Sequence, residues 1–468
     1  MLCGYRLYSR FAVRESKRAG RDLTVLFSRS RLTKVCPRLA LGLVLVAAPA
    51  KSQTIDPALA RQYFQEAEAN CKKDNGRLWG VSLCGPILFA DPETRAVVAN
   101  QADGEGRLER RDDVYVGKLP DAVGVANTAT QWAGVAWTMV MWPLPEFRQP
   151  SVRLLMHECF HRVQSRIGLP AADSTNSQLD TREGRIWLEM EWRALEHAIW
   201  SQGPARHKAI ADALYFRAYR RSLFPGAAAR ENALELNEGL AEYTGVKLSA
   251  QSLAEFAMLA DSTLRGAPDR HPNFVRSFAY VSGPAYGFLL DAAEALWRRA
   301  LTPQSDLGQL LAHAYEVQMP EVRQAEAVQR AGRYDGDEVM TIETRRDQAR
   351  QAKLTEARKR FVDGPVLILP VGSQFNYGFD PNNVFSIDED STVYLGEVQV
   401  SDEWGILKTS GGFMLVRRTG HVVRVQVPAP ADANRRPIKG DGWALDLQAG
   451  WQVAPGDRKG DLMLKKLH

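Results

Sequence analysis

The sequence predicts an α+β protein in which strands, then helices, then a second set of strands follow one another along the chain. Three observations support this prediction. Short apolar runs bounded by turn residues fill 85–145, and apolar residues at helical spacing dominate 151–340. After 365, short β-branched runs separated by Gly, Asn and Asp return. Strands and helices that are segregated in this way are typical of α+β folds or of separate domains.

A helix and several strands are expected between 51 and 150. The stretch "DPALARQYFQEAEANCKK" begins with Asp56 as an N-cap and Pro57 in the first turn, which favours a helix. The runs "PILFA" and "RAVVAN" flank the turn 91–94 and predict a hairpin. "DVYVGKLP" and "GVAWTMVMWPLP" indicate two further strands, and the prolines of the second precede the next helix.

We expect the helical part to occupy 151–340, a connecting helix 341–364 and an all-β domain 365–468. Helical patterns include "GRIWLEMEWRALEHAIW", "ENALELNEGLAEYTGVKL" and "GPAYGFLLDAAEALWRRAL". The stretch "TIETRRDQARQAKLTEARKRF" is charged almost all round, which predicts a solvated helix. The last hundred residues carry short runs such as "VLILPV" and "HVVRVQV", which predict a sandwich-like domain or a small barrel.

The overall charge of the chain is concentrated near its beginning. The 468 residues carry a formal net charge of +5, and 45% are hydrophobic and 25% charged, which suits a globular protein. Residues 1–50 hold ten Lys or Arg against two acids, Glu15 and Asp22. The other residues, with 50 basic and 53 acidic side chains, carry a net charge of −3. We therefore expect no nucleic-acid partner.

The basic beginning is typical of an export signal. The run "RLTKVCPR" precedes the apolar stretch "LALGLVLVAA", and "APA" ends at Ala50 as a small-x-small cleavage site. The apolar stretch is too short to span a bilayer. We expect 1–50 to be a leader, translation to start near Val25 or Leu32, and the mature protein to be periplasmic or secreted without a stable membrane span. The alternatives are a disordered basic tail and a membrane anchor.

Three cysteines remain after this cleavage. Cys71 and Cys84 are close in the sequence and flank the turn 74–76, which favours a disulfide between them in an oxidising compartment. Cys159 falls within a helical pattern, so we expect it to be a small buried hydrophobe.

The stretch "LLMHECFHRVQ", 154–164, combines a helical apolar pattern with two histidines. His157 and His161 are four residues apart, so their side chains lie one above the other on one side of the helix. With Glu158 they form the motif H-E-x-x-H, in which two imidazoles bind one Zn²⁺ and the glutamate takes a proton from a metal-bound water. The competing interpretation is a pair of ordinary histidines beside a glutamate.

A catalytic zinc ion needs a third protein ligand. The residues after His161, "RVQSRIGLP", contain no histidine, so the ligand must come from elsewhere. The helical stretch "ELNEGLAEYTG" offers Glu238 and Glu242 on one face, beside Gly239, which lets another helix approach closely. We expect one carboxylate to bind the metal and the other to orient a ligating histidine. A solvated acidic face is the alternative.

The histidine motif and "LNEGLAEY" together resemble the gluzincin metallopeptidases, especially the aminopeptidase N and leukotriene A4 hydrolase group. The resemblance covers about 130–300 and implies a thermolysin-like catalytic domain that holds one zinc ion. The zinc ligands that it implies are His157, His161 and Glu238. It places Glu242, together with Asn237 beside the ligand, among the residues that orient the ligands.

The same group has a Y-x-K-G segment whose tyrosine stabilises the tetrahedral intermediate. "AYVSGPAYGFLL" supplies Tyr280 at that position, with Ser282 in place of the lysine, and Tyr286 is a second candidate. The chain departs from the group in two other ways. It has no G-x-M-E-N segment before the histidine helix, and His161 and Glu238 are 77 residues apart, more than is usual in the group. The resemblance therefore supports the metal site better than an exopeptidase specificity.

These patterns predict an exported zinc metallopeptidase that acts on a peptide or protein substrate, with Glu158 as the base and Tyr280 as the oxyanion donor. The strand "GVAWTMVMW" is expected to line the cleft and to pair with an extended substrate, as edge strands do. For the tryptophans of this region we weigh two roles, shaping the cleft and, more readily, packing in the core. They are Trp132, Trp137 and Trp142.

Two alternatives belong to other functional classes. The first is a non-catalytic envelope binding or scaffold protein that retains a gluzincin fold, and the second is a zinc hydrolase of non-peptide substrates. The presence of all the expected ligand and catalytic residue types favours an enzyme. The patterns leave the oligomeric state and the role of the C-terminal domain open.

Overall fold

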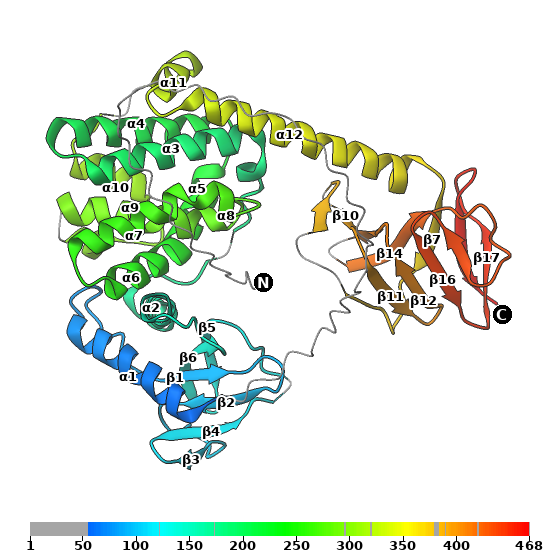
Figure 1. Ribbon diagram of the computed structural model, residues 1–468, viewed down its shortest axis with the longest axis horizontal. Helices are drawn as coiled ribbons and strands as arrows, with labels where there is room; N and C mark the ends of the chain where they lie inside the picture. Colours follow the sequence, from blue (N-terminus) through cyan, green and yellow to red (C-terminus); the bar gives the residue numbers. More distant parts are fainter. Residues whose placement is uncertain are drawn as a thin grey trace, which may run out of the picture. The chain divides into compact units, whose positions relative to one another are not determined.

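The computed structural model describes residues 55–467, except for 121, 173, 294–295, 319–320, 379–382, 389 and 419–420. The chain divides into two compact units between Gln351 and Ala352 (Figure 1). The predicted leader, 1–50, and the proposed start sites within it lie outside the described residues.

The first unit begins with one helix and a six-stranded sheet. The elements are α1 (Pro57–Asp74), β1 (Ile87–Ala90), β2 (Ala96–Ala99), β3 (Glu109–Arg111), β4 (Val114–Lys118), β5 (Thr128–Trp132) and β6 (Val135–Met141). Asp56 caps α1 as predicted, because its carboxylate accepts a hydrogen bond of 2.9 Å from the backbone N–H of Ala58. β1 and β2 form the predicted hairpin across the turn 91–94.

The strand order of this sheet is β3-β4-β2-β1-β6-β5, in which only β1 and β6 are parallel. β6 lies inside the sheet, with β1 on one side and β5 on the other. The prediction that this strand pairs with a substrate is therefore wrong, because its backbone groups are already paired in the sheet. The edge strand on that side is β5, where Ala129 and Gln131 are exposed.

The three tryptophans of this region pack in the core. Trp137 is fully buried, and its indole N–H donates a hydrogen bond of 3.0 Å to the backbone carbonyl of Trp132. Trp142 packs against Phe89 and Tyr63 with ring centroids about 6 Å apart. Of the two roles weighed from the sequence, core packing is the one that these side chains have.

The rest of the first unit is helical. Its helices are α2 (Arg148–Gln164), α3 (Arg182–Trp200), α4 (Gly203–Ser222), α5 (Ala227–Leu234), α6 (Leu240–Ser249), α7 (Leu253–Arg265), α8 (Ala267–Arg270), α9 (Ser277–Ala293), α10 (Leu307–Ala314), α11 (Gln324–Ala331) and α12 (Gly336–Arg358). Short turns of 3₁₀-helix are η1 (Ser165–Ile167), η2 (Ser177–Asp180) and η4 (Trp297–Ala300), and η3 (Glu235–Gly239) is a π-helical turn. α2 lies between the sheet and these helices, in contact with β5, β6 and α6 (Figure 1). Among the described residues, no helix has the length and apolar character needed to cross a membrane.

A disulfide ties the end of α1 to the segment that leads into β1. Cys71 and Cys84 form this bond, with Cα atoms 5.3 Å apart, which is the pairing that the sequence favoured. Cys159 is a buried free cysteine on α2, as expected, and its Sγ lies 3.8 Å from the Thr138 hydroxyl. The disulfide thus fixes the end of α1 relative to the segment before β1.

A buried network of charges joins α3, α4 and α5. Arg220 of α4 pairs with Glu191 of α3 and, at 3.0 Å, with Glu231 of α5. Burial alone would raise the pKa of Glu231, but Arg220 lowers it to about 2. Arg217 pairs with Glu235, the first residue of η3. Because an unpaired buried charge costs several kcal/mol, this network fixes η3 relative to α4.

The connecting helix begins earlier than predicted and ends close to the predicted residue, 364. α12 begins before 341, and its last turn continues as the π-helical turn η5 (Lys359–Asp363). One face of its first half is buried instead of solvated, since Glu343 is 2% exposed and pairs with Arg185 of α3 at 2.7 Å. Charged residues are expected at the surface unless they are paired. The charged pattern therefore predicted a solvated helix, because the sequence does not show the pairing partner.

Beyond η5, the second unit consists of strands in two sheets. The strands are β7 (Val366–Pro370), β8 (Asn376–Tyr377), β9 (Val384–Ser386), β10 (Ser391–Tyr394), β11 (Val398–Asp402), β12 (Gly405–Thr409), β13 (Phe413–Arg418), β14 (His421–Pro428), β15 (Ile438–Gly440), β16 (Trp443–Leu447), β17 (Trp451–Pro455) and β18 (Leu462–Lys466). Their orders are β17-β18-β7-β14-β13-β10-β9 and β15-β16-β12-β11-β8. Leu367 and Val425 of the first sheet share one core with Leu407 and Leu445 of the second. The predicted β-rich C-terminal part is therefore present, and it is built as two packed sheets.

Candidate metal centre

The two histidines of the motif lie where α2 packs closely on α6. A Cβ atom at Gly245 of α6 would be 2.4 Å from the backbone oxygen of Arg153, so glycine is needed for this approach. His157 is 5% exposed, and His161 is only slightly more accessible. Their Nε2 atoms are 3.1 Å apart. The four-residue spacing thus brings two ring nitrogens to one point beneath the surface.

Glu238 reaches the histidines from η3, the π-helical turn before α6. Its Oε2 lies 3.4 Å from the Nε2 of His161 and 3.5 Å from the Nε2 of His157. The three ligand atoms all lie within 4.8 Å of one another. Glu235, three residues earlier, pairs with Arg217 instead. The wider turn therefore directs one carboxylate to the buried charge network and the other to the histidines.

Hydrogen bonds on the far side of each imidazole fix its tautomer. The Nδ1 of His157 lies 2.7 Å from a carboxylate oxygen of Glu242, and the Nδ1 of His161 lies 2.9 Å from the amide oxygen of Gln164. Because both partners are acceptors, each neutral ring carries its proton on Nδ1 and presents a lone pair at Nε2. Two lone pairs and an oxygen of Glu238 then face one another. A metal cation bound between them would relieve this repulsion, and the donor set fits zinc.

A chain of amide side chains supports this assignment of protons. The amide N–H of Gln164 donates to Asn237 at 3.1 Å, and the amide N–H of Asn237 donates to Oε1 of Glu238 at 3.4 Å. The donations run in one direction from His161 to Glu238, which sets the orientation of both amides. Asn237 was predicted at this site, but Gln164 was missed. Its position three residues after His161 on the same helix face is the signal that would have found it.

Glu242 lies behind His157 and is held there from a second side. Its other carboxylate oxygen accepts a hydrogen bond from the guanidinium of Arg153. Burial alone would raise the pKa of Glu242, but Arg153 and His157 lower it to about 2. Arg153 was not predicted, although it precedes His157 by four residues and so shares its face of α2. Glu242 thus orients a ring, which is one of the two roles expected for the pair of glutamates.

The carboxylates around the histidines favour a positive charge between them. Burial alone would lower the pKa of His157, but its hydrogen bonds with Glu238 and Glu242 raise it to about 10. Burial likewise opposes ionisation of Glu238, yet the two histidines hold the pKa of Glu238 well below its usual range. In metal-free protein, a proton on His157 offsets the negative charge of these carboxylates. A bound divalent cation would offset the same charge while both rings stay neutral.

Glu158 lies on α2 between the two histidines in the sequence and is 4% exposed. Burial raises the pKa of this carboxyl group. Among the described residues, its Oε2 has no hydrogen-bond partner although it is shielded from solvent. A buried oxygen without a hydrogen-bond partner is costly, so it often has a functional role. Such an oxygen can accept a proton from a bound water.

Tyr280 of α9 stacks on His157. The two ring centroids are 5.6 Å apart and the ring planes differ by 7°. The Tyr280 hydroxyl lies close enough to Glu238 and Arg276 for both side chains to act on its pKa. Burial and the charge of Glu238 raise the pKa of Tyr280 far above its usual value, so the hydroxyl keeps its proton. Arg276, four residues before Tyr280, was missed from the sequence.

Tyr286, the second candidate for the oxyanion donor, lies elsewhere. Its hydroxyl donates a hydrogen bond of 2.6 Å to Glu191 in the buried charge network. Six residues after Tyr280, α9 has made more than one and a half turns, so the side chain leaves on another face. This candidate is therefore wrong.

Two glycines let α9 approach η3 closely enough to place Tyr280 at the site. A Cβ atom at Gly283 would lie 2.2 Å from the backbone oxygen of Gly239. Because that oxygen belongs to the main chain, the contact cannot be relieved by moving a side chain. The sequence expectation that Gly239 admits another helix is confirmed, and the helix is α9.

Gly283→Ala is expected to destabilise the protein by about 1–3 kcal/mol and to weaken metal binding, because α9 must shift away from η3. Urea unfolding and zinc titration would measure both effects. Gly124→Ala is the matched control, since a Cβ atom there meets no atom within 4 Å. Equal stability of the two variants would contradict the close approach.

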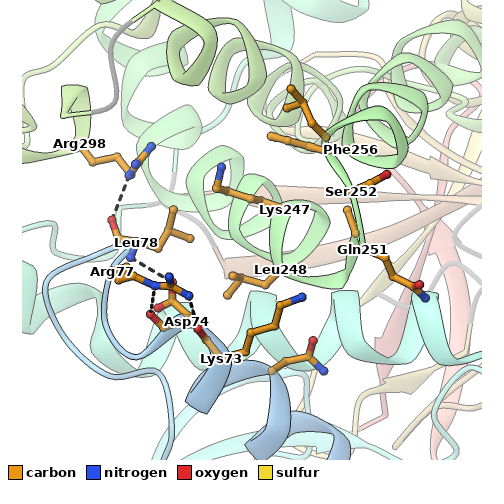
Figure 2. A pocket seen from close by; sticks show the side chains of 13 residues that line it. Lys73, Asp74, Arg77, Leu78, Lys247, Leu248, Gln251, Ser252, Phe256 and Arg298 are labelled. Atoms are coloured by element: carbon orange, nitrogen blue, oxygen red, sulfur yellow. Dashed lines mark hydrogen bonds between the residues drawn. The ribbon is translucent and has the colours of Figure 1, made fainter.

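A separate cavity of about 430 Å³ lies between the end of α1 and the junction of α6 with α7 (Figure 2). Its walls include the apolar side chains of Leu248 and Phe256 and the basic side chains of Lys247 and Arg298. Both basic groups pair with the same carboxylate, that of Asp291. The cavity shares no residue with the candidate metal centre.

The structure thus gathers most of the predicted site residues around one point and adds three neighbours. The predicted residues at the centre are His157, Glu158, His161, Asn237, Glu238, Glu242 and Tyr280. The added residues are Arg153, Gln164 and Arg276. Comparison of the chain with protein families, curated proteins and solved structures finds no match.

Proposed function

We propose that this chain is an exported zinc metallopeptidase of the gluzincin type, which hydrolyses peptide bonds. The observation that carries the proposal is the convergence of His157 and His161 with Glu238, 77 residues further along the chain. Two imidazole nitrogens and one carboxylate oxygen form the ligand set of a catalytic zinc site, in which a fourth position remains for water. Export is supported by the leader pattern in 1–50.

The roles of the side chains follow from their positions. His157, His161 and Glu238 would hold the ion, and zinc, when bound, supplies a Lewis acid for a water molecule and a substrate carbonyl. Glu158 takes the proton of the attacking water and delivers it to the leaving amine. Tyr280, which keeps its proton, donates a hydrogen bond to the carbonyl oxygen as negative charge develops there.

A catalytic role is favoured over a scaffold role by features that a structural metal site does not need. Glu158 keeps a buried oxygen without a partner among the described residues. Within the described part of the chain the group offers three protein ligands, whereas structural zinc sites have four. A protonated tyrosine lies against one ligand ring. Each feature serves hydrolysis and none is required to hold a metal for stability.

The proposed substrate is a peptide or protein that is cut at internal bonds. The chain has no G-x-M-E-N segment to bind a free amino terminus. An extended peptide can add to a sheet only at an edge, and β5 offers such an edge beside α2. Slow turnover of aminoacyl anilides together with cleavage of internal bonds in a peptide library is the specificity that this proposal expects.

The purified protein should contain about one zinc ion per chain, because the three ligands converge on one point. Elemental analysis of protein that has never met a chelator measures this stoichiometry. Incubation with a peptide library, followed by mass spectrometry, then identifies the cleaved bonds. Protein without zinc would refute the proposal at its first step.

Protein that binds zinc and cleaves no peptide would point to the scaffold role or to another class of substrate. The zinc measurement and the cleavage measurement therefore test separate parts of the proposal.

A further inference from the structure

Arg276 precedes the first turn of α9, and its side chain is about half exposed at the candidate metal centre. One of its terminal nitrogens donates a hydrogen bond of 2.8 Å to Oε1 of Glu238. The same side chain lies close enough to the Tyr280 hydroxyl to lower its pKa. Arg276 thus contacts the candidate third ligand in η3 and lies near the candidate oxyanion donor on α9.

The contact with Arg276 divides the two oxygens of Glu238 between separate tasks. Oε1 accepts hydrogen bonds from Arg276 and Asn237. Oε2 is the oxygen that faces the Nε2 atoms of the two histidines. A carboxylate held in this way can offer one oxygen to a metal, because the other is engaged by two donors. Binding through one oxygen leaves more of the coordination sphere for water and substrate.

Arg276 also offsets the negative charge at the centre. Glu158, Glu238 and Glu242 all lie close to His157. Arg153 pairs with Glu242, and Arg276 pairs with Glu238, so each of these two carboxylates has its own guanidinium. A guanidinium can donate from several nitrogens in a fixed plane, whereas an ammonium is a single point charge. Only the former can hold Glu238 and Tyr280 in one rigid arrangement.

We propose that Arg276 is a positioning residue, which holds Glu238 in single-oxygen coordination of the metal and keeps the Tyr280 hydroxyl beside it. This inference rests on the proposed function, since it concerns the same metal. It assigns to Arg276 no contact with the reacting atoms. Its action is exerted through Glu238 and Tyr280.

The test compares Arg276→Met and Arg276→Lys with the wild type in the full mature chain. Arg276→Met should weaken zinc binding by about 10–100-fold in a chelator competition, as loss of a group that orients a ligand does. The visible absorption of the cobalt-loaded protein should also weaken, because a second oxygen of Glu238 would enter the coordination sphere. Arg276→Lys should recover only part of both signals.

The matched control is Arg265→Met. Arg265 lies on α7, is exposed, and pairs with Glu196 and Asp261 away from the centre. The substitution Arg265→Met should leave the zinc affinity and the cobalt spectrum unchanged. Circular dichroism of each variant without metal establishes that the fold is retained before affinities are compared. A loss of helix stability alone would not alter the cobalt spectrum, so the spectrum separates positioning from folding.

The inference is overturned if Arg276→Met matches Arg265→Met in zinc affinity and in the cobalt spectrum. Full recovery of both signals in Arg276→Lys would also overturn it, because one point charge would then suffice. These outcomes presuppose wild-type protein that binds one zinc ion. Absence of zinc from the wild type is a different result, which refutes the proposed function itself.

Discussion

Glu158→Gln is expected to lower peptide hydrolysis by roughly 100-fold to 10,000-fold, the usual contribution of a general base. The substitution keeps the size and shape of the side chain but removes its capacity to take a proton. Glu158 is not one of the three ligands, so the variant should retain about one zinc ion per chain. Rates with a peptide found in the library digest, together with elemental analysis, measure both quantities.

Glu93→Gln is a suitable control for this experiment, since Glu93 is exposed in the turn between β1 and β2. It should leave hydrolysis and zinc content unchanged. If Glu158→Gln binds zinc and cleaves peptides at the wild-type rate, Glu158 is not the base. The substitution breaks no hydrogen bond of Oε2, since this oxygen has no partner among the described residues.

Glu238→Ala is expected to remove zinc, whereas Glu242→Ala should weaken its binding by about 10–100-fold. Glu238 points an oxygen at both Nε2 atoms, so its loss leaves two ligands. Glu242 contacts His157 only through Nδ1, so its loss frees the ring without removing a ligand. Dissociation constants from chelator competition would distinguish these two results.

The comparison between the two glutamates has an internal control in the helix that they share. Both lie in the continuous segment of η3 and α6, and both are buried, so nonspecific damage should affect them alike. Retention of full zinc by Glu238→Ala together with loss in Glu242→Ala would show that the ligand and its supporting residue are exchanged. Equal effects of the two substitutions would contradict this division of roles between Glu238 and Glu242.

The parts of the site that could be predicted are those set by local periodicity. Residues four apart on a helix share a face whatever surrounds them, so the pairing of His157 with His161 was readable from spacing alone. The disulfide between Cys71 and Cys84 depends on a short turn and was readable for the same reason. The sequence could not predict which histidine Glu242 contacts, because that depends on how α6 packs against α2.

Two of the three residues that were missed share a physical cause. Arg153 and Arg276 are arginines near helix ends, and most such residues are solvated. Their importance comes from carboxylates brought by other helices, Glu242 for the first and Glu238 for the second. Tyr286 was a wrong candidate because it lies on another face of α9 than Tyr280, where its hydroxyl contacts Glu191.

The sequence by itself determined the order of elements, the two histidines on one face of α2 and the β-rich C-terminal part, because each of these follows from patterns within short stretches. Only the tertiary structure decided that β6 is an interior strand, that Glu343 is buried against α3, and that Glu238 meets the histidines through a π-helical turn. These features depend on which distant segments become neighbours. Strand order and helix crossings are set by packing of the whole unit, and no local period records them.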